Sequence, residues 1–355
     1  EQLTAVKCYK KAIAINPEYA KAHFNLGGIY FEMEKFQDSI ESYDRSLEID
    51  SNNYEAHYYI AKSFKKNGSP DFAIKSYKKA LEISPSFIEA LYGLGFLYQE
   101  LGETNEAVNH YQKVIEIKPN LAEVHNKAGE CFEVLGRLKD ALLAFQKAVD
   151  INPVYSEAYN NLGNTFKATG QLDNAIKSYK KALDINPEYP ALHNNLGSAY
   201  KSLGNHKDAV KSYLKGLALN PSYIDILNNL GVAYTELGEM NEAINTLKKA
   251  IAIKPDYAEA YNNLGIAYQR LGEIDKAFKS FERALAIKSD YAKAHHNLSS
   301  LKKYTKSDKQ IVEMESLLSI KDLSQSDRIF ICFALAKAYE DLGKQEELFK
   351  VLHEG

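Results

Sequence analysis

The chain has 355 residues, with 44 Lys and Arg residues against 47 Asp and Glu residues, so its formal net charge at pH 7 is −3. The basic residues are spread along the whole chain, which argues against the one-sided basic face of a nucleic-acid-binding protein. No apolar run reaches the about 20 residues that a membrane-spanning helix needs. We therefore expect neither a nucleic-acid nor a membrane partner.

The cysteine spacing and the start of the chain indicate in which cellular compartment the protein is expected. Cys8, Cys131 and Cys332 stand far apart, which is neither a disulfide framework nor a metal-ligand spacing. Few and widely separated cysteines suit a reducing compartment. No signal-peptide pattern is present, although the chain opens at Glu1 instead of Met. We therefore expect a cytoplasmic location.

Proline returns every 34 residues, at Pro17, Pro85, Pro119, Pro153, Pro187, Pro221 and Pro255. Ser51 and Ser289 occupy the two places in this register where proline is missing. A fixed period of this size indicates a solenoid, in which one supersecondary unit is stacked many times. No single unit can bury its apolar face, so neighbouring units must supply the core.

Numbering each unit so that its proline is position 32 divides the chain into three parts. Residues 1–19 are the second half of a truncated unit, residues 20–291 are eight complete units, and residues 292–355 diverge from the pattern. Because the chain starts in mid-repeat, we expect it to be a fragment of a longer protein.

Within each unit the apolar spacing is helical, not alternating. In residues 156–189 a first apolar stripe ends at Gly170, because glycine adopts the left-handed conformation that closes a helix at little energetic cost. A second apolar stripe follows and stops at Pro187, which lacks the amide needed to continue a helix. Each unit is thus expected to be a pair of helices.

Glycine recurs at position 8 of the first helix, where it costs about 1 kcal/mol relative to alanine. The copies are Gly27, Gly95, Gly129, Gly163, Gly197, Gly231 and Gly265. A large residue recurs at position 24 of the second helix, as in Tyr43 and Phe145. This pairing predicts a close crossing of the two helices, with no room for a side chain at position 8.

Leu, Gly and Tyr at positions 7, 8 and 11, followed by Ala, an aromatic residue, Ala and Pro at positions 20, 24, 27 and 32, resemble the tetratricopeptide repeat family. The resemblance covers about three quarters of the chain. It implies an all-α, right-handed superhelical solenoid of antiparallel helix pairs. First helices would line a concave groove, and second helices would form the outer wall.

A row of asparagines marks the candidate peptide-binding groove. Position 6 holds Asn161, Asn195, Asn229, Asn263 and Asn297, and position 5 holds Asn160, Asn194, Asn228 and Asn262. A carboxamide has donors and an acceptor, so it can pair with either polar group of an extended peptide backbone. The Asn-Asn-Leu-Gly run resembles the asparagine ladder of O-linked N-acetylglucosamine transferases. The alternative is that these asparagines serve only the structure of the repeat.

Acidic residues recur at position 2, as Glu55, Glu89, Glu123, Glu157, Asp225 and Glu259. If this position faces the groove, then Glu157, Asp225 and Glu259 beside the asparagine row favour a basic partner segment. The alternative is that acids in a first helical turn stabilise the helix dipole, by about 0.3–1 kcal/mol each. The two-carboxylate clamp of the family needs Lys at position 5, and no unit has it.

Histidine recurs at position 4, as His23, His57, His125, His193 and His295. Neighbouring helix axes are about 8–10 Å apart, which is too far for two of these rings to share a zinc ion at about 2 Å per bond. We therefore predict packing and no metal site. The chain also lacks the phosphate-loop, dinucleotide, His-Glu-x-x-His and Gly-x-Ser-x-Gly signatures, so we expect no catalytic residue and no cofactor.

After Leu301 the register breaks. A helix is expected at about residues 308–318, and Ser326 or Asp327 is expected to cap another helix, with a partner at residues 345–353. The run from Phe333 to Gly343 resembles the last repeat before the catalytic domain of microbial repeat–sulfotransferase proteins, which implies a catalytic domain beyond Gly355. The alternative is an ordinary solenoid cap.

The leading hypothesis is therefore a non-catalytic scaffold whose concave groove holds an extended peptide or partner segment. A second hypothesis is that the chain is the substrate-recruiting arm of a larger sulfotransferase, or of a glycosyltransferase, with its catalytic domain after residue 355. A third is self-association through the open end at residues 1–19.

Overall fold

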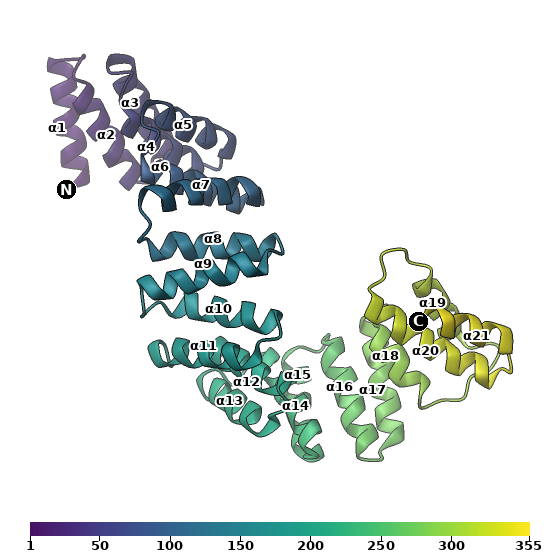
Figure 1. The fold of residues 1–355 in the computed structure, drawn as a ribbon. Coiled ribbons are helices and arrows are strands. Elements are labelled where there is room, and N and C mark those ends of the chain that lie inside the picture. The colour runs from purple at the N-terminus through teal and green to yellow at the C-terminus, as the bar shows by residue number, and fades with distance from the viewer. The chain divides into compact units, whose positions relative to one another are not determined.

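The computed structural model describes residues 1–355 and contains 21 α-helices and no strand (Figure 1). The first helices of the units are α2 (Ala20–Glu32), α4 (Tyr54–Lys66), α6 (Ile88–Glu100), α8 (Ala122–Val134), α10 (Ser156–Ala168), α12 (Pro190–Ser202), α14 (Ile224–Leu237) and α16 (Ala258–Arg270). The second helices are α3 (Phe36–Ile49), α5 (Pro70–Ile83), α7 (Thr104–Ile117), α9 (Leu138–Ile151), α11 (Leu172–Ile185), α13 (His206–Leu219), α15 (Met240–Ile253) and α17 (Ile274–Ile287).

Five more helices complete the chain. They are α1 (Gln2–Ile15), α18 (Ala292–Ser299), α19 (Lys309–Leu318), α20 (Gln325–Asp341) and α21 (Gln345–Glu354). The predicted all-α solenoid of antiparallel helix pairs is confirmed. None of the helices combines the length and the apolar character that crossing a bilayer requires.

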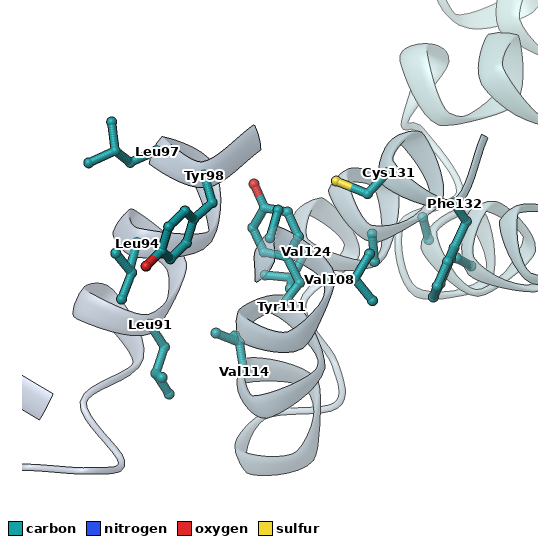
Figure 2. Close-up of a cluster of buried hydrophobic side chains, with 14 of the residues drawn as sticks. Leu91, Leu94, Leu97, Tyr98, Val108, Tyr111, Val114, Val124, Cys131 and Phe132 are labelled. Atoms are coloured by element: carbon teal, nitrogen blue, oxygen red, sulfur yellow. The ribbon is translucent and has the colours of Figure 1, made fainter. Parts of the chain in front are cut away.

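The chain divides into two large parts, each made of several repeats. We call residues 1–169 the first unit and residues 170–355 the second unit. In the first unit each helix from α1 to α10 packs against the helices next to it in sequence, and the same holds from α11 to α18 in the second. Figure 2 shows part of the first unit's core, where Leu94 and Tyr98 of α6 lie beside Tyr111 of α7, and Val124 and Phe132 of α8 follow. Apolar side chains of consecutive helices from α4 to α10 therefore form one continuous cluster.

The close crossing predicted at position 8 is confirmed. A Cβ atom built on Gly129 would stand 2.6 Å from the ring of Phe145, and one on Gly265 would stand 2.5 Å from the ring of Phe281. Both distances are shorter than carbon atoms tolerate, so the absent side chain is what lets the position-24 ring pack directly against the first helix. Where position 8 is Ala61, the hydroxyl end of the Tyr77 ring reaches the next first helix and packs against its Gly93.

The turn between the two helices of a repeat contains a residue in the left-handed backbone conformation. Gly68 has a φ of +74° and Gly136 has a φ of +70°. The amide after each glycine donates to the carbonyl oxygen five residues earlier, as from Arg137 to Phe132 at 2.8 Å. Glu34 is the one residue other than glycine with a positive φ, at +59°, so that turn carries backbone strain.

Four of the five position-4 histidines contact the turn between consecutive repeats, namely His23, His125, His193 and His295. His23 Nε2 lies 3.0 Å from the carbonyl oxygen of Pro17, and His125 Nε2 lies 2.8 Å from that of Pro119. His295 makes the equivalent contact at 2.8 Å with Ser289, which replaces the proline. Because a carbonyl oxygen only accepts, Nε2–H must be the donor. These rings pack as predicted, and each one also satisfies a carbonyl group of the preceding turn.

The divergent tail packs on the last regular helices. α18 ends at Ser299, and the following non-helical segment buries Tyr304, whose amide donates to Asp341 Oδ2 at 3.1 Å. The predicted cap of α20 at Ser326 or Asp327 is wrong. Ser324 is the N-cap, and its Oγ accepts the amide of Asp327 at 3.1 Å, so the helix starts two or three residues earlier than the apolar pattern indicates.

Candidate peptide-binding surface

The second unit contains a hollow of about 640 Å³ on the side of its first helices. Its floor carries the position-5 and position-6 asparagines of α14, α16 and α18, namely Asn228, Asn229, Asn262, Asn263 and Asn297. Its opposite wall comes from the divergent tail between Leu317 and Phe330. We call this site the asparagine hollow.

The asparagines are bonded to one another from repeat to repeat. Asn263 Nδ2 donates to Asn228 Oδ1 at 2.8 Å, and Asn297 Nδ2 donates to Asn262 Oδ1 at 2.8 Å. Asn229 donates in the same way to Asn194 at 3.1 Å. Each of these three position-6 side chains thus donates one N–H to the position-5 carbonyl oxygen of the preceding repeat. The sequence hypothesis treated all of these groups as available to a peptide, and the structure shows that part of their capacity is used internally.

The two positions differ in exposure. Asn228 and Asn262 are only 8% and 2% exposed, whereas the three position-6 residues of the hollow are half-buried. The position-5 residues therefore act as acceptors beneath the surface. The position-6 side chains are held in place by them. Each keeps a second N–H, and Asn263 and Asn297 also keep a carbonyl oxygen, whereas the carbonyl oxygen of Asn229 accepts from Lys201.

The same bond occurs once in the first unit, where Asn161 Nδ2 donates to Asn126 Oδ1 at 3.2 Å. Asn126 is fully buried and was missed from the sequence, although its place at position 5 is a signal that could have found it. Asn160 and Asn161 belong to α10 of the first unit and do not line the asparagine hollow. Asn194 and Asn195 lie on α12 and are not part of its lining either.

Charged residues of both signs surround the asparagine hollow. Glu259 lines it, whereas Glu157 and Asp225 are exposed residues outside its lining. Lys201 Nζ donates to Asn229 Oδ1 at 3.0 Å. Burial, together with the carboxylates of Glu259 and Asp327, raises the pKa of Tyr291 to about 12, so this hydroxyl stays neutral at physiological pH.

Apolar side chains give the asparagine hollow a second kind of surface. Ile266 contributes from position 9 of α16, and Leu317, Ile320, Leu323 and Phe330 contribute from the tail. Ile320 is 47% exposed. Nothing in the sequence pattern indicated that these tail residues face the asparagine row, because the tail lies outside the repeat register. The site therefore combines carboxamides suited to a backbone with an apolar wall suited to a side chain.

The first unit has a hollow of about 730 Å³ built from the same register positions with other side chains. Position 5 is Tyr58 in α4 and Tyr92 in α6, and position 9 is Lys62 and Phe96. We call this site the aromatic hollow. No group of three His, Cys, Asp or Glu side chains in the structure is arranged to hold a metal ion.

Family models match most of the repeats. The model described as TPR repeat matches residues 3–34, 71–102, 134–170, 163–204, 197–238 and 233–272, which is more than half of the chain. The model described as tetratricopeptide repeat matches residues 20–53, 88–121 and 258–291. No curated protein matches the chain, and the resemblances to glycosyltransferases and to sulfotransferases find no support.

Two solved structures with TM-scores above 0.5 share this fold, and MamA matches part of the chain. A tetratricopeptide repeat protein from Parabacteroides merdae is 18% identical, with a TM-score of 0.54, over 69% of this chain and 97% of that one. The Cut9–Hcn1 hetero-tetramer of the APC/C is 18% identical, with a TM-score of 0.51, over 94% of this chain and 82% of that one. MamA is 31% identical, with a TM-score of 0.45, over 46% of this chain and 95% of its own. From the repeat match over more than half of its length, the chain belongs to the tetratricopeptide repeat family.

Proposed function

We propose that this chain is a non-catalytic scaffold that binds an extended peptide or partner segment in the asparagine hollow. The observation that carries the proposal is the inter-repeat bonding of the position-6 carboxamides. Asn229, Asn263 and Asn297 are each held by a bond of 2.8–3.1 Å and line one hollow. Side chains fixed in advance lose little conformational entropy when a ligand binds.

The spacing of the row suits an extended backbone. Neighbouring helix axes are about 8–10 Å apart, and an extended chain advances about 3.3 Å per residue. One carboxamide therefore meets every second or third peptide residue, and the row covers about five or six residues. Contacts to peptide N–H and C=O groups tolerate many sequences, and the apolar wall at Ile320 and Phe330 adds a preference for one large side chain.

The test is selection of binders from a phage-displayed library of random dodecapeptides against the full chain. We expect Asn263→Ala/Asn297→Ala to weaken the selected peptides about 5- to 150-fold, because each of the two lost backbone bonds contributes about 0.5–1.5 kcal/mol. N-methylation of peptide amides, one at a time, should weaken binding at every second or third residue, where a carboxamide is expected to contact the peptide backbone.

Asn126→Ala is the matched control. It breaks the same kind of bond, that from Asn161, in the other unit and away from the asparagine hollow. Binding that survives Asn263→Ala/Asn297→Ala unchanged, or that falls equally with Asn126→Ala, would contradict the proposed role of the row.

A further inference from the structure

The aromatic hollow of the first unit differs chemically from the asparagine hollow. Its lining includes Phe31 of α2, Tyr58 of α4, and Tyr92 and Phe96 of α6. The hydroxyl of Tyr92 donates to Glu123 of the next first helix, which fixes the orientation of that ring. No asparagine lines this hollow, so its lining offers no carboxamide to a peptide backbone.

Lys62 is the only cation of the aromatic hollow placed among several rings. Its Nζ lies 5.2 Å from the ring centroid of Phe31, 5.5 Å from that of Tyr58 and 5.5 Å from that of Tyr59. No carboxylate is paired with it, whereas the neighbouring Lys65 pairs with Glu100 Oε2 at 2.7 Å. Burial, with Lys66 nearby, lowers the pKa of Lys62. A half-buried ammonium without a counter-ion is stabilised by an incoming carboxylate.

The surroundings of Lys62 decide which ligands fit. The ammonium of this chain already fills the space among the three rings, so a cationic ligand is excluded from it. Three lysines line the hollow against two glutamates, Glu89 and Glu100. That excess of one positive charge suits one carboxylate better than a nucleic-acid strand, which brings a phosphate with every nucleotide.

We propose that the aromatic hollow is a second peptide site, which binds a segment carrying an Asp or Glu beside a large apolar residue. The carboxylate pairs with Lys62, and the apolar side chain packs against Tyr92 and Phe96. This site does not depend on the asparagine hollow, so either can fail without the other.

The experiment uses the full chain and the same dodecapeptide library, with counter-selection against Lys62→Met. Methionine has similar length and packs among the rings without a charge. Peptides that need Lys62 should be enriched in an acidic residue next to Phe, Tyr, Trp or Leu, and should bind Lys62→Met at least about tenfold more weakly. Lys62→Arg should retain most of the binding, and Lys62→Glu should select basic peptides instead.

Lys75→Met is the matched control, because Lys75 lies 5.5 Å from the Phe72 ring centroid on the same unit and outside the hollow. It should leave binding unchanged, and Asn263→Ala/Asn297→Ala should leave these peptides bound. The proposal is overturned if Lys62-dependent peptides lack acidic residues, if no such peptide is found, if Lys75→Met has the same effect, or if a fluorescein-labelled oligo-uridylate binds in a Lys62-dependent way. Melting curves by circular dichroism confirm that each variant is folded.

Discussion

At the residue scale, three recurring side chains determine how helices meet. The position-8 glycine lets the position-24 ring approach, as Gly129 does for Phe145. The position-4 histidine donates to the turn before its own helix, as His125 does to Pro119. The position-6 asparagine donates to an asparagine of the preceding repeat, as Asn263 does to Asn228. Each contact joins two helices, so a change at one residue acts on the packing between elements.

Gly129→Ala should destabilise the protein. The added Cβ would stand 2.6 Å from the Phe145 ring, and such overpacking costs about 1–3 kcal/mol, of which the better helix propensity of alanine returns up to about 1 kcal/mol. We expect a net loss of about 1–2 kcal/mol in urea unfolding followed by circular dichroism. Gly28→Ala is the control, because its Cβ would meet only the Tyr43 hydroxyl, at 3.5 Å, so it should be neutral or stabilising.

His295 should make the stability of the second unit depend on pH. Its ring is fully buried, Nε2 donates to Ser289, and Nδ1 lies 3.2 Å from Gln310 Nε2, which donates to it. Burial lowers the pKa of His295 from its ordinary value of 6.5, although the Ser289 contact opposes this. The unfolded chain therefore binds the proton more readily than the folded chain. The stability contribution is complete above about pH 6.5 and decreases as the pH falls.

Thermal melts at several values between about pH 7 and pH 5 measure this effect. His295→Gln removes the titrating ring, so its melting temperature should fall less steeply with decreasing pH than that of the native chain. The exposed His353 at the end of α21 supplies the control, since His353→Gln changes no buried contact. Parallel curves for His295→Gln and the native chain would refute the assignment.

At the element scale, the helix ends decide where the divergent tail lies. Ser324 caps α20 two or three residues before the predicted position, and the segment between α19 and α20 lines the asparagine hollow through Ile320 and Leu323. The tail therefore contributes side chains to the asparagine hollow and does not only cover the last repeat. Its helix boundaries place apolar side chains opposite the asparagine row.

Ser324→Ala should loosen α20 by about 1 kcal/mol, the usual contribution of an N-cap, because the Asp327 amide loses its acceptor. Hydrogen exchange of the amides in the first turn of α20 should accelerate about fivefold, as that free energy implies. Gln325→Ala is the control, because Gln325 is an exposed neighbour of Ser324 and is not the cap residue. Equal acceleration in both variants would show that Ser324 is not the cap.

At the scale of the whole molecule, one repeat architecture presents two different surfaces. Positions 5 and 9 carry Tyr58 and Lys62 in the first unit, and Asn262 and Ile266 in the second. A solenoid permits this because each repeat is stabilised by apolar contacts with its neighbours, which leaves the first-helix positions that line a hollow free to vary. The distinct peptide preferences that we propose for the two hollows follow from that freedom.

The helix pairs, their boundaries within the units and the contact between glycine and ring could be predicted from the sequence, because they depend on local periodicity and on residues 16 apart, such as Gly129 and Phe145. The asparagine row was also visible as a pattern. Only the tertiary structure decided that Asn263 donates to Asn228, that the tail faces the row, and that Lys62 lies among three rings without a counter-ion. Asn263 and Asn228, like Lys62 and Phe31, lie on different first helices, so their contacts depend on how consecutive first helices pack, which the repeat pattern alone does not specify. The tail lies outside the repeat register, so the pattern does not place it at all.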